Sequence, residues 1–90
     1  MKIVFSEEAQ QDFCSLDGQL KQFFQSHFKK LLSLPPRRHL QHGVPHHAED
    51  VTRQARLVFD VEDNATAPIL WVVRCFATHK EYEKWFRSYQ

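Results

Sequence analysis

The chain has little cysteine, little glycine and almost no net charge. Its two cysteines, Cys14 and Cys75, are too few for a disulfide framework, so we expect two reduced, buried thiols in a cytoplasmic protein. With only two glycines, the sequence holds no glycine-rich phosphate loop. It also lacks a Cys-X-X-Cys pair, a nucleophile elbow around a serine and a paired-carboxylate arrangement. The commonest sequence signatures of nucleotide-binding, redox and hydrolytic sites are therefore missing.

Long apolar runs and a strong charge of one sign are also absent. No apolar run approaches the roughly 18 residues that a membrane span needs, and no apolar segment ending in small residues follows Lys2, so we expect no membrane segment and no signal peptide. A net charge of +1 gives no overall field that attracts nucleic acid. The charge is uneven, however, because residues 37–56 hold four arginines and four histidines against two acids. A local basic surface is possible there.

Apolar and aromatic residues are abundant, at 42% and 13% of the ninety positions. This content excludes a disordered chain. At this length, folding buries roughly 60–65% of the surface of the unfolded chain, which is enough for one core. We therefore expect residues 1–90 to form a single domain.

The first third of the sequence predicts one strand and two helices. Residues 2–5 are typical of a short strand, and Ser6 is a suitable N-cap for a helix that runs to about residue 16. The pair Asp17-Gly18 interrupts the helical pattern. From about residue 19 to 32, apolar residues recur at three- and four-residue steps, which predicts an amphipathic helix. Its apolar stripe consists of Leu20, Phe23, Phe24, Phe28 and Leu31.

The remaining sequence predicts strands and a short final helix. Residues 37–50 indicate a loop with one short edge strand at most. Alternation over residues 51–61 predicts a strand, residues 62–68 a polar hairpin loop, and the nearly continuous apolar run 69–77 a central strand. Residues 81–88 fit a short helix. The order is that of an α+β domain, in which an N-terminal strand and helical hairpin pack on a small, mostly antiparallel twisted sheet with the helices on one face.

Two arginines, Arg56 and Arg74, interrupt these otherwise apolar strands. A strand arginine is costly to bury unless it is paired or faces an open surface. Each could pair with a nearby acid such as Asp60 or Glu62. Alternatively, a guanidinium offers phosphate a bidentate fork and stabilises the charge that develops during phosphoryl transfer. The residues alone leave both roles open.

A second polar group, His79-Lys80-Glu81-Tyr82, follows the last predicted strand. Histidine suits proton transfer near neutral pH, and tyrosine can stack on a base or donate a hydrogen bond to a phosphate. Because the group lies at the end of a sheet that carries Arg56 and Arg74, it is a candidate for a phosphate-processing site.

A third group is a histidine cluster. Imidazoles are common zinc ligands, but no cysteine lies nearby, and Gly43 and Pro45 break any helix that would align the rings. A polar loop that contacts RNA, or one without a function, fits the pattern better than a metal site. The members are His39, His42, His46 and His47.

Three segments together resemble the RelE/ParE superfamily of toxins from bacterial type II toxin–antitoxin pairs. Ile3-Val4-Phe5-Ser6-Glu7-Glu8-Ala9, with the two helices that follow, is similar to the opening strand and helical hairpin of that family. Ala55-Arg56-Leu57-Val58-Phe59 resembles its Tyr-Arg-Leu-Ile/Val-Tyr strand. Trp71-Val72-Val73-Arg74 through Thr78-His79-Lys80-Glu81-Tyr82 is similar to the last strand and tail of HigB-type members.

The resemblance implies an endoribonuclease that cuts mRNA, usually on the ribosome, by attack of the RNA 2′-hydroxyl on the adjacent phosphate. It implies no metal or other cofactor, and a cognate antitoxin that covers the site in a hetero-oligomer. By position, Arg56 corresponds to the arginine that contacts the scissile phosphate, His79 to a residue near the leaving group, and Tyr82 to the tail. Arg74 joins this catalytic set on chemical grounds alone. The residues expected to contact RNA are Lys80, Arg53, His46, His47 and Lys84.

The sequence also departs from the family pattern. Many members are strongly basic, whereas this chain is nearly neutral, and Ala55 stands where the family often has tyrosine. A histidine-rich stretch replaces a segment that usually supplies lysine or arginine, so His46 or His47 could instead act as an acid or base. Three alternatives stay open: a ParE-like inhibitor of DNA gyrase, a non-catalytic relative that only binds an antitoxin, and a histidine-rich metal binder.

Overall fold

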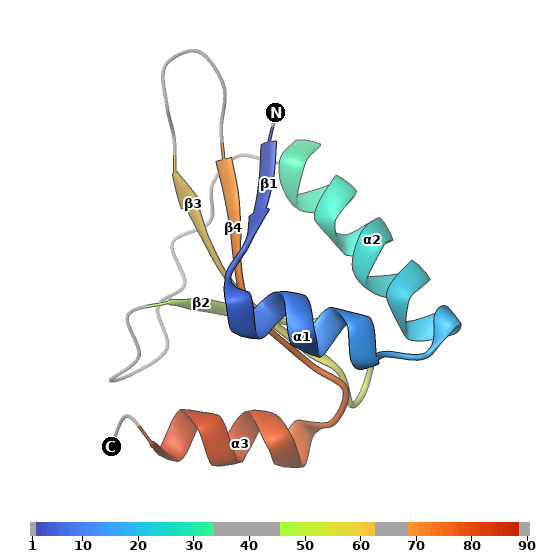
Figure 1. The fold of residues 1–90 in the computed structure, drawn as a ribbon, viewed down its shortest axis with the longest axis vertical. Coiled ribbons are helices and arrows are strands. Elements are labelled where there is room, and N and C mark those ends of the chain that lie inside the picture. The colour runs from blue at the N-terminus through green and yellow to red at the C-terminus, as the bar shows by residue number, and fades with distance from the viewer. Residues whose placement is uncertain (1, 34–45, 63–68, 89–90) are drawn as a thin grey trace.

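The computed structural model describes residues 2–33, 46–62 and 69–88, which form a four-stranded sheet and three helices (Figure 1). None of the described helices is long and apolar enough to cross a membrane. The predictions for residues 34–45 and 63–68, with His39 and His42, lie outside the described residues. The strands are β1 (Lys2–Phe5), β2 (His47–Asp50), β3 (Arg56–Glu62) and β4 (Ile69–Phe76), and the helices are α1 (Glu7–Ser15), α2 (Gly18–Ser33) and α3 (His79–Arg87).

The sheet has the strand order β1-β4-β3-β2. β1 runs parallel to β4, whereas β4 with β3, and β3 with β2, are antiparallel. This mostly antiparallel α+β arrangement confirms the predicted fold class. Val58 pairs with Arg74 but Phe59 pairs with Val72, so Val73 is an extra residue in β4 and forms a β-bulge. A bulge bends its strand and redirects the side chains beside it, and Arg74 directly follows this one.

Ser6 links β1, α1 and β4. As predicted, it is the N-cap of α1, and its Oγ accepts a hydrogen bond from the Ala9 N–H at 3.0 Å. The same Oγ donates to the Val73 carbonyl at 2.7 Å, and the Ser6 N–H donates to the Val72 carbonyl at 2.9 Å. One residue therefore starts the helix and fixes it against the central strand.

Asp12 of α1 continues this edge of β4. β1 ends at Phe5, opposite Val72, so within the described residues α1 rather than a strand flanks the rest of β4. There the Asp12 carboxylate accepts from the Cys75 N–H at 3.1 Å and from the Arg74 guanidinium at 2.6 and 3.1 Å. A bidentate carboxylate–guanidinium pair is both strong and geometrically specific. It ties α1 to β4 beyond the point where β1 ends.

One face of the sheet packs on α1 and α2 and holds the larger core. Phe5 joins the two helices through edge-to-face contacts with Phe13 and Phe28, at centroid distances of 5.5 and 5.6 Å. The predicted stripe of α2 is correct at Phe24 and Phe28, which are buried, but wrong at Phe23, which is 44% exposed. Adjacent residues of a helix point about 100° apart, and the rotation of α2 that buries Phe24 turns Phe23 toward solvent. The sheet contributes Leu57, Phe59, Leu70 and Val72 to this core.

The opposite face of the sheet is covered by α3, which crosses one end of it (Figure 1). Val58 and Phe76 pack against Tyr82, and Trp85 and Phe86 complete this smaller core. The prediction that the helices share one face of the sheet is therefore wrong. Tyr82, Trp85 and Phe86 recur at three- and four-residue steps, which gives α3 an apolar side, and the face under α1 and α2 is already occupied.

The link between β2 and β3 also differs from the prediction. β3 begins at Arg56 rather than at residue 51, because Thr52 Oγ1 accepts from the Ala55 N–H at 2.9 Å and the Val51 N–H donates to the Ala55 carbonyl at 3.0 Å. These bonds bend residues 51–54 into a tight connection. The short edge strand expected within residues 37–50 is β2, and it is antiparallel to β3.

The prediction that both cysteines are buried is correct for Cys75 and wrong for Cys14, which is exposed on α1. Burial, reinforced by the negative charge of Asp12, raises the pKa of the Cys75 thiol from 9.0 to about 12. Arg74 opposes this shift but does not reverse it. The Cys75 thiol therefore stays protonated near neutral pH, and a protonated thiol is a poor nucleophile.

In the folded protein at about pH 8, we expect a disulfide reagent such as dithionitrobenzoate to modify Cys14 quickly and Cys75 only when the protein unfolds. The measurement is the absorbance of the released thiolate before and after denaturant is added. Cys14→Ser should abolish the fast phase, and the Cys75 thiol should still react after denaturant is added. A fast phase equal to two thiols in the native protein would contradict the burial of Cys75.

Replacing Asp12 by Asn should lower the free energy of unfolding by about 2–3 kcal/mol, because the Arg74 guanidinium loses its partly buried counter-charge. Urea denaturation followed by circular dichroism measures this loss. Glu7→Gln removes the same charge from an exposed site on α1 and should change the stability by about 0.5 kcal/mol or less. Equal free energies of unfolding for the two variants would mean that the Asp12 contacts contribute nothing to the stability of the fold.

Candidate active site between the sheet and the C-terminal helix

Arg56 opens β3 on the face covered by α3, and its guanidinium is held on two sides. Nε lies 2.9 Å from Oδ1 of Asp50, its pairing partner on β2. Nη1 donates to the carbonyls of Thr52, Arg53 and Ala55 at 3.0 to 3.1 Å. The side chain of Asp50 is 73% exposed, so solvent screens its charge and leaves much of the positive field of Arg56 available. No described residue accepts a hydrogen bond from Nη2.

Tyr82 projects from α3 into the core on this face. Its ring contacts Phe76 at a centroid distance of 6.1 Å, and the side chain is buried. Burial raises the pKa of the Tyr82 hydroxyl, while Arg56 lowers it and Asp50 raises it further. The hydroxyl thus lies within electrostatic range of the Arg56–Asp50 pair. Because the net shift is upward, Tyr82 is protonated at neutral pH and can donate a hydrogen bond.

His79 is the first residue of α3 and not part of an irregular tail. Thr78 Oγ1 accepts from the Glu81 N–H at 3.2 Å and caps the helix, so α3 begins two residues earlier than predicted. Nε2 of His79 lies 2.7 Å from the carboxylate of Glu83, and the two rings of His79 and Tyr82 are 6.1 Å apart. Nδ1 is shielded from solvent and has no partner among the described residues.

The contact with Glu83 determines which nitrogen of a neutral His79 carries the hydrogen. An ionised carboxylate only accepts, so Nε2 is the donor and Nδ1 keeps a lone pair. A shielded acceptor without a partner is unfavourable in the free protein. Because Nδ1 has no exposed surface, a ligand could reach this acceptor only if the His79 side chain rotated.

The fold brings together three of the four residues predicted to be catalytic: Arg56, Tyr82 and His79. Arg74 is held separately, by the two hydrogen bonds from its guanidinium to Asp12 of α1. Those bonds raise the pKa of Arg74, which is therefore charged at neutral pH. Because a bidentate carboxylate already matches its charge, Arg74 is less suited than Arg56 to bind a phosphate.

The two described histidines of the cluster contact opposite sides of the sheet. Nδ1 of His46 lies 2.7 Å from Asp60, and its ring lies 6.4 Å from Trp85 of α3. His47 stacks at 5.5 Å on Phe59, which belongs to the core under α1 and α2. Only His46 is therefore on the side of the candidate site. Among the described residues, no group of three or more histidine, cysteine or acidic side chains could hold a metal ion.

The cations predicted to contact RNA, Arg53, Lys80 and Lys84, are all exposed. Lys80 and Lys84 lie one turn apart on α3, and Arg87 extends the row by another turn. At a rise of 1.5 Å per residue, the three charges are spaced roughly 4.5–6 Å apart along the helix axis. The sequence prediction omits Arg87, although the spacing i, i+4, i+7 signals it. A row of exposed cations suits the repeating phosphates of a nucleic-acid backbone.

Two further residues of the site are missing from the sequence prediction. Glu83 orients His79, and the i, i+4 spacing on a helix is the signal that could have found it, once α3 is known to begin at His79. Asp50 holds Arg56 across the β2–β3 pair, and this contact depends on a strand register that the sequence does not reveal.

A solved structure with a similar arrangement is the "YoeB/ParE toxin from Agrobacterium tumefaciens". The comparison has a TM-score of 0.66 at 15% sequence identity and covers 84% of this chain and 97% of that chain. The two proteins share a fold. This likeness confirms the fold that the resemblance in the sequence implies. No protein-family model and no curated protein matches the sequence.

Because Arg56 holds the β2–β3 connection, Arg56→Lys should lower the free energy of unfolding by about 1–2 kcal/mol, since lysine cannot reproduce the planar fork of donors. Arg53→Lys makes the same change on the exposed neighbour and should change the stability by about 0.5 kcal/mol or less. Urea midpoints measure both effects. Equal midpoints would show that the internal contacts of Arg56 contribute nothing to the fold.

Proposed function

We propose that this protein is the toxin of a type II toxin–antitoxin pair and that it cleaves mRNA on the ribosome without a metal ion. The fold shared with a YoeB/ParE toxin is the observation that carries the proposal. The grouping of Arg56, Tyr82 and His79 beside the start of α3 supports the chemistry. The physiological partner is then a cognate antitoxin that covers this site in a hetero-oligomer.

In the proposed reaction, the RNA 2′-hydroxyl attacks the adjacent phosphorus. The P–O2′ bond forms, the P–O5′ bond breaks, and the products are a 2′,3′-cyclic phosphate and a 5′-hydroxyl. The His79 imidazole accepts the proton of the attacking hydroxyl, and Glu83 stabilises the imidazolium that results. Nη2 of Arg56 stabilises the charge on the phosphate oxygens. Tyr82 is protonated because its pKa is raised, and it gives a proton to the leaving 5′ oxygen.

Substrate binding in this proposal relies on a few charges and on the ribosome. Lys80, Lys84 and Arg53 are exposed and can contact phosphates, and His46 lies on the same side of the sheet. The net charge of +1 is too small to bind free RNA tightly, because backbone charge neutralisation dominates such binding. A ribosome that presents the mRNA would supply the missing affinity.

Incubation of the purified protein with translating ribosomes, followed by mapping of mRNA 5′ ends, tests the proposal. We expect new ends bearing a 5′-hydroxyl, and His79→Ala should reduce their rate of formation about 100-fold or more, since general acid–base catalysis contributes on that order. His27→Gln is a matched control on α2, where the ring contacts Glu49 instead. If the wild type cleaves nothing, or if His79→Ala cleaves as fast as His27→Gln, the proposed mechanism is wrong.

A second candidate is a toxin of the same fold without RNA chemistry, such as a ParE-like inhibitor of DNA gyrase. The observation that favours it is that both strand arginines have structural partners, Arg56 with Asp50 and Arg74 with Asp12. A gyrase supercoiling assay separates the candidates. Inhibition of supercoiling, with no mRNA cleavage and no effect of His79→Ala, would favour this second function.

A further inference from the structure

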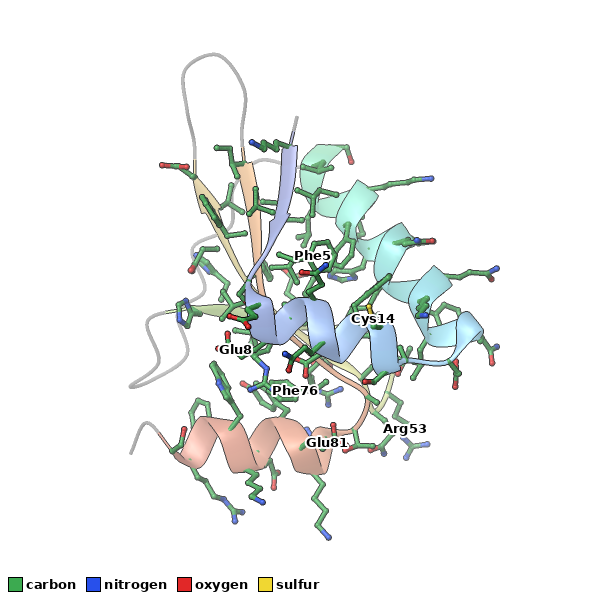
Figure 2. The ribbon with its side chains drawn as sticks, viewed as in Figure 1. Phe5, Glu8, Cys14, Arg53, Phe76 and Glu81 are labelled. Carbon is green, nitrogen blue, oxygen red and sulfur yellow. The ribbon has the colours of Figure 1, made fainter. Side chains whose placement is uncertain are left out.

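An open cleft lies between β4 and α3. It has a volume of about 430 Å³ and is lined by Arg74, Phe76, Glu81, Lys84 and Trp85. Figure 2 shows Phe76 between α1 and α3, with Glu81 on α3 beside it. The volume falls within the range of about 300–1,000 Å³ that is usual for small-molecule sites. The bond-making and bond-breaking steps of the proposed cleavage use none of these five residues, and only Lys84 is also among the cations proposed to contact RNA.

The wall formed by β4 holds the guanidinium of Arg74 over the buried ring of Phe76. The guanidinium of Arg74 lies 4.7 Å from the centroid of the Phe76 ring, and its two hydrogen bonds to Asp12 fix its plane. The Arg74 side chain is still 27% exposed. Trp85 lies 5.8 Å from Phe76 and adds a second aromatic ring to the cleft. Nucleobases in single-stranded RNA stack on aromatic rings and on arginine planes of this kind.

The charges around the cleft do not favour a phosphate. Asp12 offsets the charge of Arg74, and Glu8 adds a further negative field there. Glu81 brings another carboxylate, against a single additional cation, Lys84. An anion would therefore gain little binding energy in this cleft. A neutral planar ring that carries hydrogen-bond donors could stack on Arg74 and donate to the carboxylate of Glu81.

The wall formed by α3 presents a hydrogen-bonding pattern that matches one base. Glu81 and Lys84 are three residues apart, on neighbouring turns of α3, and neither has an ion-pair partner within the described part of the chain. A carboxylate offers two acceptors and an ammonium only donors. The Watson–Crick edge of guanine has two adjacent donors, N1–H and N2–H, beside one acceptor, O6. Adenine, cytosine and uracil each present only one donor group on that edge, so they can pair with only one carboxylate oxygen.

We propose that this cleft binds a guanine base of the RNA, stacked against Arg74 and Trp85 and read by Glu81 and Lys84. This inference rests on the proposed function, and it adds a preference for guanine at a fixed distance from the cleaved bond. Lys80, exposed one turn before Lys84, is placed to contact the phosphate of the same nucleotide.

Titration of the ¹⁵N-labelled protein with each of the four nucleoside monophosphates tests the proposal without requiring cleavage. The indole N–H signal of Trp85 reports on the cleft, and that of Trp71, whose Nε1 bonds to Glu62, is an internal control. Trp71→Phe assigns the two signals. We expect guanosine monophosphate to shift the Trp85 signal and to bind about tenfold or more tightly than the other three, since a bidentate base contact discriminates on that order.

Glu81→Gln should reduce the preference for guanine to about twofold or less, because an amide has only one acceptor. Glu7→Gln removes the same charge from α1 and should leave the preference unchanged, and the ¹⁵N spectrum shows whether each variant is folded. Equal binding of the four nucleotides, no shift of Trp85, or an unchanged preference in Glu81→Gln would overturn the inference. RNA cleavage without guanine selectivity would refute this inference alone, whereas selective guanine binding without any RNA cleavage would refute only the proposed function.

Discussion

The carboxylate of Asp12 takes the place of a strand beside β4. Beyond Phe5 the edge of β4 has lost its β1 partner, and Asp12 binds both the Cys75 N–H and the Arg74 guanidinium there. Without it, a main-chain donor and a partly buried charge would lie without partners, and either state is costly. Ser6 makes the corresponding contact to the Val73 carbonyl at the bulge. These two side chains of one short segment fix the course of β4, and β4 leads directly into α3.

The position of α3 in turn creates two candidate functional surfaces from one helix. On one side, Tyr82 and His79 lie near Arg56, which is the grouping to which the proposed RNA cleavage is assigned. On another side, Glu81 and Lys84 face the Arg74–Phe76 stack, which is the proposed base site. Arg74 thereby has a physical role that does not require phosphate: Asp12 orients its guanidinium and leaves one face of the plane partly exposed. A few polar contacts on α1 thus determine the geometry of a site built from the opposite end of the chain.

The sequence predicts the helices and strands better than it predicts how they pack against one another. Short-range signals, such as the N-cap at Ser6 and the apolar spacing of Phe24 and Phe28, are local and correct. The face of the sheet on which α3 packs is not determined by local sequence, because it depends on which face α1 and α2 cover. The same limit applies to the site. His79 and Tyr82 are recognisable as chemical groups, but the partners that orient the neighbouring arginines, Asp50 and Asp12, depend on strand register and on the docking of α1. Nothing in the spacing of Asp12 and Arg74, 62 positions apart, predicts their contact.

The central claim is that the RNA 2′-hydroxyl is the nucleophile and that this site activates it. The most direct measurement replaces that single hydroxyl by hydrogen, in an mRNA that carries one 2′-deoxynucleotide at a mapped cleavage position. Cleavage should disappear at that position, because no P–O2′ bond can form, and should continue at unmodified positions of the same molecule. Continued cleavage at the deoxynucleotide would contradict the proposed mechanism, since the phosphate would then be attacked by another nucleophile.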